Sequence, residues 1–124
     1  MNILNALKTF LEENTENKVT AEYLPDKPDD IVAFFIYGNI PAPDNSLTRY
    51  VQVQVRGLDP LTVYEEATRL SHLMDSGSEE ELIDIGGEWL VHCAPTQRPK
   101  SFGQDNLKRF TYYFEFALWG DDKA

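Results

Sequence analysis

The sequence contains little of what metal, redox or disulfide sites need. Among its 124 residues there is one cysteine, Cys93, and there are two histidines, His72 and His92. A single cysteine cannot form a disulfide within the chain, which fits a protein made in the reducing cytosol. His92 and Cys93 are neighbours on a predicted strand, so their side chains point to opposite faces of a sheet. No Cys-x-x-Cys or His-x-x-x-His spacing occurs, and we expect no bound metal.

Positive charge is also scarce, since 11 Lys and Arg residues stand against 21 Asp and Glu residues and the net charge is −10. Such a chain repels the phosphates of nucleic acids and the surface of an anionic membrane. No apolar run is long enough to cross a bilayer, and residues 1–18 lack the continuous apolar run of a signal peptide. We therefore expect neither specific nucleic-acid binding nor a membrane partner.

Motifs for catalysis are missing as well. The serines around Gly77 lack the strand-turn-helix context of a nucleophile elbow, and Gly86-Gly87 lacks the further glycines of a phosphate-binding loop. The carboxylate runs Asp29-Asp30 and Glu79–Glu81 are typical of a solvated surface. We expect no catalytic residue, no cofactor and no enzymatic activity. A small enzyme, the alternative, would need a pocket of converging polar side chains, which the sequence does not indicate.

What the sequence does contain is enough apolar residues, 42%, for one hydrophobic core in a single domain over residues 1–124. Helical periodicity runs through residues 2–13 and again from Asp59-Pro60 to the turn at Gly77. Each helix has an apolar stripe on one face. We expect these stripes to pack on a sheet through Leu4, Leu7, Phe10, Leu11, Val63, Ala67 and Leu70.

Alternating or continuous apolar runs predict the strands. These runs are 19–23, 31–38, 49–57, 82–85, 88–94 and 109–119. Their order with the helices predicts an α+β fold, with a mostly antiparallel (mixed) β-sheet and two α-helices packed on one face. Phe34, Ile36 and Val53 should lie beneath the helices. Between strands we expect two long loops, Gly38–Thr48 and Pro95–Lys108.

One face of the strand 49–57 is a candidate contact surface. Its valines alternate with Tyr50, Gln52, Gln54 and Arg56, which differ from the Lys/Glu mixture of an ordinary solvated strand. Such side chains bond well to a partner, and we expect them at or near a subunit contact or a channel lining. A solvated sheet face is the alternative.

The second candidate surface is the loop at Pro95–Lys108. In an otherwise acidic chain, positive charge gathers around it at Arg98, Lys100, Lys108 and Arg109. A basic loop that meets an acidic surface on a neighbouring copy would steer assembly and fix its register. A mobile surface loop with incidental cations is the alternative.

Several short motifs follow one another in a familiar order. Tyr-Leu-Pro-Asp-Lys-Pro-Asp-Asp (23–30) leads into the strand 31–37, and the strand 50–57 is followed by the helical Tyr-Glu-Glu-Ala (64–67). Pro-Lys-Ser-Phe-Gly-Gln-Asp (99–105) then precedes Lys-Arg-Phe (108–110) and an aromatic strand. From about Leu4 to Phe116 this order resembles the small minor capsid and tail terminator proteins of long-tailed (siphovirus-type) bacteriophages.

The resemblance implies a structural protein of the virion, made in the cytoplasm of the bacterial host and located at the junction of head and tail. Proteins of this family form a ring, usually a hexamer, that caps the tail tube and joins the tail to the head. Their partners are further copies of themselves, the tail tube protein and the head-completion or connector proteins. DNA passes through the lumen without specific binding, and an acidic lining would keep it mobile. Solubility is an equally good reason for the acidity.

Two other functions stay open. A head-completion or connector protein of the same assembly would have a related fold. A small acidic protein-binding module would use the same strand face in a one-to-one complex. Ring formation that depends on concentration would favour the virion roles, whereas a stable monomer would favour the module.

Overall fold

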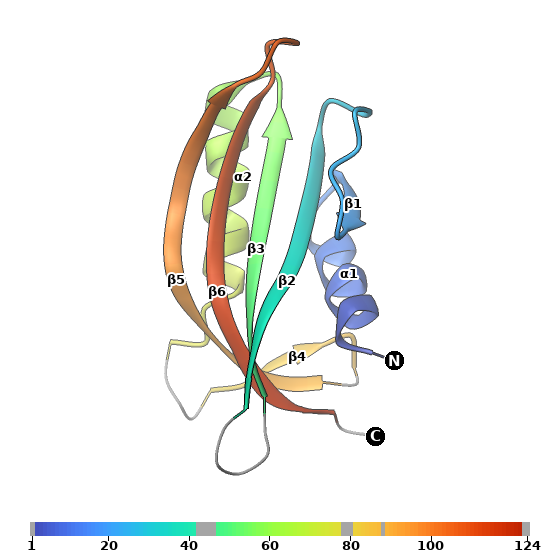
Figure 1. Cartoon of the computed structure of the whole chain (residues 1–124), viewed down its shortest axis with the longest axis vertical. Coiled ribbons are helices and arrows are strands. Elements are labelled where there is room, and N and C mark those ends of the chain that lie inside the picture. The colour runs from blue at the N-terminus through green and yellow to red at the C-terminus, as the bar shows by residue number, and fades with distance from the viewer. Residues whose placement is uncertain (1, 42–46, 78–80, 88, 123–124) are drawn as a thin grey trace.

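The computed structural model describes residues 2–41, 47–77, 81–87 and 89–122, which form the α+β fold expected from the sequence. Helices α1 (Ile3–Asn14) and α2 (Pro60–Leu73) lie on one face of a curled sheet (Figure 1). The strands are β1 (Lys18–Ala21), β2 (Ile31–Pro41), β3 (Leu47–Gly57), β4 (Ile83–Ile85), β5 (Trp89–Gln104) and β6 (Phe110–Asp122).

The sheet is mixed, with the strand order β1-β2-β3-β6-β5-β4. β1 is parallel to β2, and the other neighbouring strands are antiparallel. Helix α1 contacts both β1 and β4, the two outermost strands, while α2 packs on β3, β5 and β6. Because one helix reaches both edges, the sheet curls around the helices. Its opposite face carries no helix in the described chain.

The core lies between the helices and the sheet, as the periodicity predicts. The helix α1 begins at Asn2, whose side-chain oxygen accepts a hydrogen bond from the backbone N–H of Asn5 at 2.8 Å. The expected contact residues Leu7, Leu11, Val63, Ala67, Leu70, Phe34 and Val53 are all buried, and Leu4, Phe10 and Ile36 are partly buried against them. The assignment of the apolar faces is therefore confirmed.

The first expected loop, Gly38–Thr48, is shorter than its composition suggests. β2 continues to Pro41 and β3 starts at Leu47, with a shift of register after Tyr37. Gly38 has φ +64° at this shift, a conformation that glycine adopts without steric cost. The middle of the loop, residues 42–46, lies outside the described residues.

The prediction of a second loop at Pro95–Lys108 is wrong for most of that range, because residues up to Gln104 belong to β5. β5 runs on to Gln104 and pairs with β6 through three irregularities of register. Proline has no N–H to donate, but beyond Cys93 no described strand pairs with the other side of β5, so Pro95 and Pro99 are tolerated on this edge. The remaining turn is short and leads from Asp105 to Arg109.

Beyond the pairing with β4, the edge of β5 is closed by hydrogen bonds of Ser76. The backbone N–H and the hydroxyl of Ser76 both donate to the carbonyl of Cys93, at 2.9 and 2.8 Å. The N–H of Cys93 donates in turn to the Ser76 hydroxyl at 2.7 Å. Ser76 thus replaces a strand partner at this position, and the edge is free from there toward the turn.

Candidate functional site

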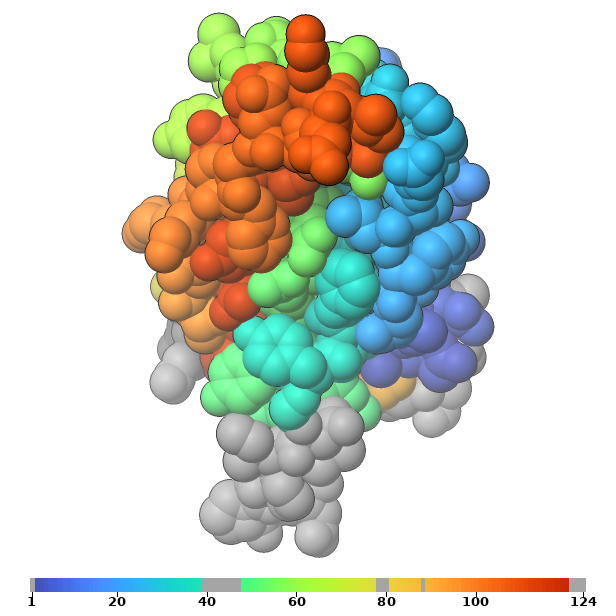
Figure 2. Space-filling view, turned by 45° about the horizontal axis from the view of Figure 1, so that its top comes forward, coloured from blue at the N-terminus to red at the C-terminus, as the bar shows by residue number. Residues whose placement is uncertain are grey.

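The helix-free face of the sheet carries a connected set of polar side chains. We call it the uncovered face and define it by Tyr37, Tyr50, Gln52, Gln54, Phe102, Tyr113 and Glu115. Figure 2 shows β5, β6, β3 and β2 side by side on this face. Gln52 and Glu115 are register partners on β3 and β6, and the Gln52 amide donates to the Glu115 carboxylate at 2.9 Å. Gln54 donates to Gln52 at 2.8 Å, so the row is fixed within the sheet.

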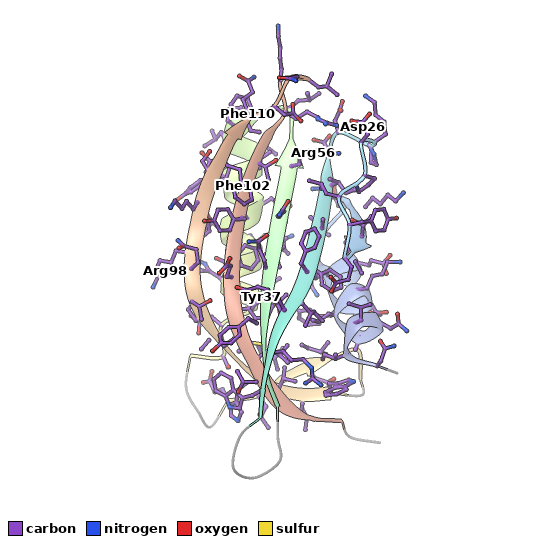
Figure 3. The ribbon with its side chains drawn as sticks, viewed as in Figure 1. Asp26, Tyr37, Arg56, Arg98, Phe102 and Phe110 are labelled. Carbon is purple, nitrogen blue, oxygen red and sulfur yellow. The ribbon has the colours of Figure 1, made fainter. Side chains whose placement is uncertain are left out.

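Aromatic rings flank this polar row. Tyr37 stacks on Tyr50 with ring centroids 5.9 Å apart, and Phe102 stacks on Tyr113 at 4.2 Å. The side chains of Tyr37 and Phe102 lie over the strands on this face (Figure 3). They stay 43% and 56% exposed, although aromatic rings of this size are usually packed. The uncovered face therefore offers apolar rings in fixed positions beside satisfied polar groups.

Tyr37 belongs to the aromatic rings and is also hydrogen-bonded to the polar row. Its hydroxyl donates to the other Glu115 carboxylate oxygen at 2.9 Å. Partial burial, followed by the hydrogen bond and the charge of Glu115, raises the pKa of Tyr37 to about 12. The phenol thus keeps its proton, and continues to donate, to a higher pH than an ordinary tyrosine.

Arg56, a candidate contact residue from the sequence, has a role within the chain. It is 4% exposed, and its guanidinium donates to the carbonyls of Pro25 and Pro28 at 2.8 Å. It also donates to the carbonyls of Asp26 and Asp29 at 3.3 Å. Figure 3 shows Arg56 beside Asp26 at the end of the sheet. Arg56 therefore fixes the loop at residues 25–29 and is not part of the uncovered face.

Arg109 fixes the same loop from the other side. Its guanidinium donates to Asp105 at 2.8 Å, lies 3.4–3.5 Å from the carboxylates of Asp26 and Asp29, and also bonds the carbonyl of Asp26. The backbone N–H of Arg109, and then its side chain, lower the pKa of Asp105. The turn 105–109 and the loop 25–29 are thus joined through one arginine that is only 6% exposed.

The other three candidate cations differ from these two arginines. Arg98, Lys100 and Lys108 are exposed and have no ion pair among the described residues. Arg98 points away from β5 at the free edge of the sheet (Figure 3). The hairpin of β5 and β6 therefore carries free positive charge on its outer side.

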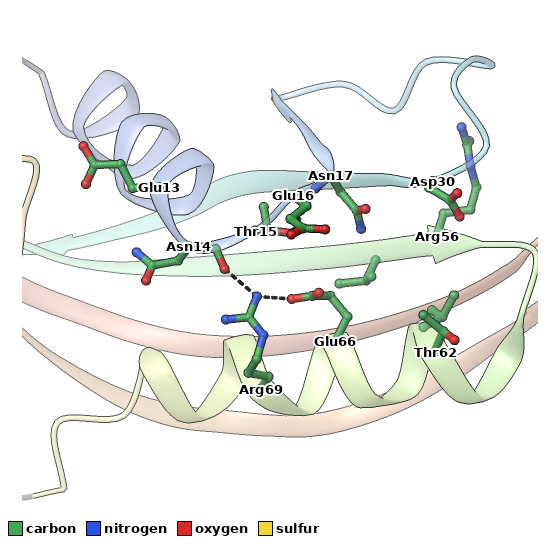
Figure 4. Close-up of a pocket in the computed structure, with 12 residues that line it drawn as sticks. Glu13, Asn14, Thr15, Glu16, Asn17, Asp30, Arg56, Thr62, Glu66 and Arg69 are labelled. Carbon is green, nitrogen blue, oxygen red and sulfur yellow. Dashed lines mark hydrogen bonds and ion pairs between the residues drawn. The ribbon is translucent and has the colours of Figure 1, made fainter.

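An open cleft of about 630 Å³ lies between the end of α1, the residues after it and α2 (Figure 4). Arg69 crosses this cleft, because it donates to the carboxylate of Glu66 and to the carbonyl of Asn14. Glu13, Glu16 and Asp30 also line it and have no ion pair in the described part of the chain. The cleft is thus acidic and partly bridged.

Groups that could do chemistry are not brought together in the described residues. Within that part of the chain, no group of three or more His, Cys, Asp or Glu side chains is placed to hold a metal ion. Burial raises the pKa of the Cys93 thiol to about 12, which leaves it a poor nucleophile. Glu79 and Glu80 of the expected carboxylate run lie outside the described residues. No described helix is long and apolar enough to span a membrane.

Sequence reasoning found part of the uncovered face and missed its other half. The alternation in 49–57 indicates Tyr50, Gln52 and Gln54, but their partners on β6 and β2 are far away in the chain. The alternation in 109–119 places Tyr113 and Glu115 opposite the core, a signal that could have included them. For Phe102, which the sequence assigns to a loop, there was no such signal.

Comparison with known proteins shows a likeness to solved structures. No protein family profile and no curated protein matches the sequence. A chain in a solved structure of the virion of a native gene transfer agent particle matches with a TM-score of 0.58. The match covers 97% of this chain and 98% of that chain at 10% sequence identity. The two chains therefore share the fold over nearly their whole lengths.

Proposed function

We propose that this chain is a structural protein of a phage-like virion. The observation that carries the proposal is the likeness to a chain of the gene transfer agent virion, which includes both helices and the whole described sheet. A whole-length match between two chains of similar size supports a related role more strongly than a shared motif does. Fold alone does not fix function, however, so the proposal also depends on the surfaces of this chain.

The surfaces support an assembly role rather than catalysis. The uncovered face presents exposed rings in fixed positions, and the side chains of its polar row are hydrogen-bonded to one another: Tyr37 and Gln52 to Glu115, and Gln54 to Gln52. A surface of this kind loses little side-chain entropy when a protein partner covers it. We therefore assign the chain a non-enzymatic role without a cofactor, in which protein partners cover this face.

Within the virion, we propose the position that the sequence resemblance implies, which is the junction of head and tail. The chain forms a ring, usually a hexamer among the proteins that it resembles, which caps the tail tube and joins the tail to the head. Its partners are further copies of itself, the tail tube protein and the head-completion or connector proteins. DNA passes through the lumen, where the net charge of −10 per chain disfavours contact with phosphates. A head-completion or connector role in the same assembly is the second candidate, because related folds serve there.

Electron microscopy and native mass spectrometry of the purified chain over a range of concentrations test this proposal. We expect rings with a central channel and a single predominant copy number. A chain that stays monomeric at all concentrations, and also in the presence of tail tubes, would contradict the proposal and favour a one-to-one binding module. Addition of the rings to polymerising tail tube protein then distinguishes a tail terminator from a head-completion or connector protein, since only a terminator stops tube growth.

A further inference from the structure

We propose that adjacent copies of this chain are joined by the cationic hairpin of one copy and the acidic cleft of the next. The hairpin surface consists of Arg98 and Lys100 on the free edge of β5. The cleft surface consists of Glu13, Glu16 and Asp30 between α1 and α2. This inference deepens the proposed function, on which it rests, because it names the two surfaces that would make the ring.

Charge complementarity is the first argument. Residues 98–109 carry four cations and one carboxylate, in a chain whose net charge is −10. Arg109 and Asp105 are bonded to each other at 2.8 Å, which leaves Arg98, Lys100 and Lys108 as exposed positive charge. The cleft is lined by four carboxylates and two guanidiniums. Arg69 is paired with Glu66, whereas Arg56 donates to neutral carbonyls and keeps its charge, so the four carboxylates and two guanidiniums leave the cleft with a net charge of −2.

The position of the two surfaces is the second argument. In the strand order, β3 and β6 separate β5 from β1 and β2. The loop that joins β1 to β2 lies beside the cleft. Arg98 projects from the outer side of β5 (Figure 3) and lines a small hollow with Ser71 and His72 of α2, which shares no lining residue with the cleft. The hairpin of a copy therefore leaves that copy's own cleft open, and each copy can use both surfaces at once.

The symmetry of the contact follows from the signs of the charges. If two hairpins met each other around a two-fold axis, Arg98 and Lys100 would face identical cations, which is unfavourable. Contact between hairpin and cleft places opposite charges together. It is heterologous, that is, head to tail, when each copy uses its hairpin on one neighbour and its cleft on another, whereas two copies that exchange both contacts form a two-fold dimer. Heterologous contacts form closed rings when the rotation between copies closes, and filaments when it does not. Local charge thus allows the type of contact that a ring requires, and the copy number measured by native mass spectrometry distinguishes a ring from a two-fold dimer.

Charge reversal on each surface tests the proposal. The hairpin variant is Arg98→Glu with Lys100→Glu, and the cleft variant is Glu13→Lys with Glu16→Lys. We expect each variant alone to assemble at least about tenfold more weakly than the parent chain in native mass spectrometry and light scattering. The matched controls, Lys8→Glu with Lys18→Glu and Glu65→Lys with Glu81→Lys, change the charge equally outside both surfaces and should assemble like the parent chain.

Restoration identifies the partner surface. A chain with both reversed surfaces should assemble again, because every contact is once more between opposite charges. An equimolar mixture of the two variants should also assemble, into rings with an even number of alternating copies. Only folded variants can restore assembly, so this result also excludes misfolding as the reason for the losses.

Other results would overturn the proposal. If the parent chain forms rings and both variants do so equally well, the contact lies elsewhere while the proposed ring stands. If the hairpin variant alone loses assembly and the double reversal does not recover it, the hairpin meets another surface or another protein. If the parent chain never assembles, the ring itself is contradicted, and the proposed function fails with it.

Discussion

Replacement of Arg56 by methionine tests whether this residue stabilises the folded chain or serves a contact between copies. Methionine keeps much of the unbranched aliphatic length but removes the guanidinium. The loop at residues 25–29 then loses the donor that binds its carbonyls. We expect Arg56→Met to lower the free energy of unfolding and to loosen this loop.

The expected loss follows from the four hydrogen bonds. The two bonds to Pro25 and Pro28 are 2.8 Å long, and because the desolvation of the buried guanidinium offsets part of the gain from a charged donor, each contributes about 1–1.5 kcal/mol net. The two bonds at 3.3 Å add little, because hydrogen bonds weaken as they lengthen. The total is a loss of about 2–3 kcal/mol in the free energy of unfolding. Arg56→Lys should recover only part of it, since an ammonium group cannot span the carbonyls that the planar guanidinium reaches.

Urea denaturation followed by circular dichroism measures the loss. The protein concentration should be low enough that assembly does not add to the apparent stability. Arg98→Met is the matched control, because Arg98 is exposed on the same sheet, and its effect should stay within about 0.5 kcal/mol. If Arg56→Met also changes stability by less than about 0.5 kcal/mol and instead weakens assembly, the structural role given to Arg56 is refuted.

Three further predictions concern the core, the loop cluster and the cysteine. Leu70→Ala should destabilise the chain by about 2–5 kcal/mol in the same assay, because Leu70 is a fully buried core residue of α2. The pKa of Asp105 is lowered on folding, so its stabilising effect is present above the pKa of the unfolded chain. That effect should be lost as the pH falls through the folded-state value, and in an acid titration Asp105→Asn should remove this part of the loss. Cys93 has a pKa of about 12, so at pH 8 iodoacetamide should label it slowly in the folded chain and rapidly in urea.

The sequence predicted those parts of the fold that depend on local periodicity. The stripe through Leu7 and Leu11 and the alternation of Val51, Val53 and Val55 each have one period and one buried face. In such segments the burial of side chains and the backbone geometry require the same assignment. Both helices and the mixed sheet could therefore be predicted without knowledge of any long-range contact.

The extent of β5 could not be predicted in this way. Its second half contains Pro95, Pro99 and Gly103, and such a composition is normally found in loops. It forms a strand because β6 supplies a partner on one side, while the other side needs no donors. Which side of a strand is free depends on the whole topology, and local sequence carries no information about it.

Long-range contacts also decide which cations bond within the chain, as Arg56 and Arg109 do, and which stay exposed. Arg56 alternates with surface residues on β3, but its acceptors are 27 to 31 residues earlier in the chain. Arg109 reaches Asp26 across 83 residues. Strand alternation assigned Arg56 to a contact surface and the local concentration of cations assigned Arg109 to one, although the hydrogen bonds of both are made within the chain. The surface prediction is thus weakest for side chains long enough to reach a distant loop.

The net negative charge of each copy and the opposite charges of the hairpin and the cleft together predict how salt affects assembly. Two copies of net charge −10 repel one another at long range, whereas the proposed hairpin and cleft attract only when they meet. Salt at about 0.1 M has a Debye length of about 10 Å, which screens the long-range repulsion more than a direct contact. At about 1 M that length falls to about 3 Å, and the contact itself is weakened. Assembly measured against sodium chloride should therefore pass through a maximum. A steady increase up to the highest concentration would instead indicate that apolar contacts, such as the exposed rings of Tyr37 and Phe102, hold the copies together.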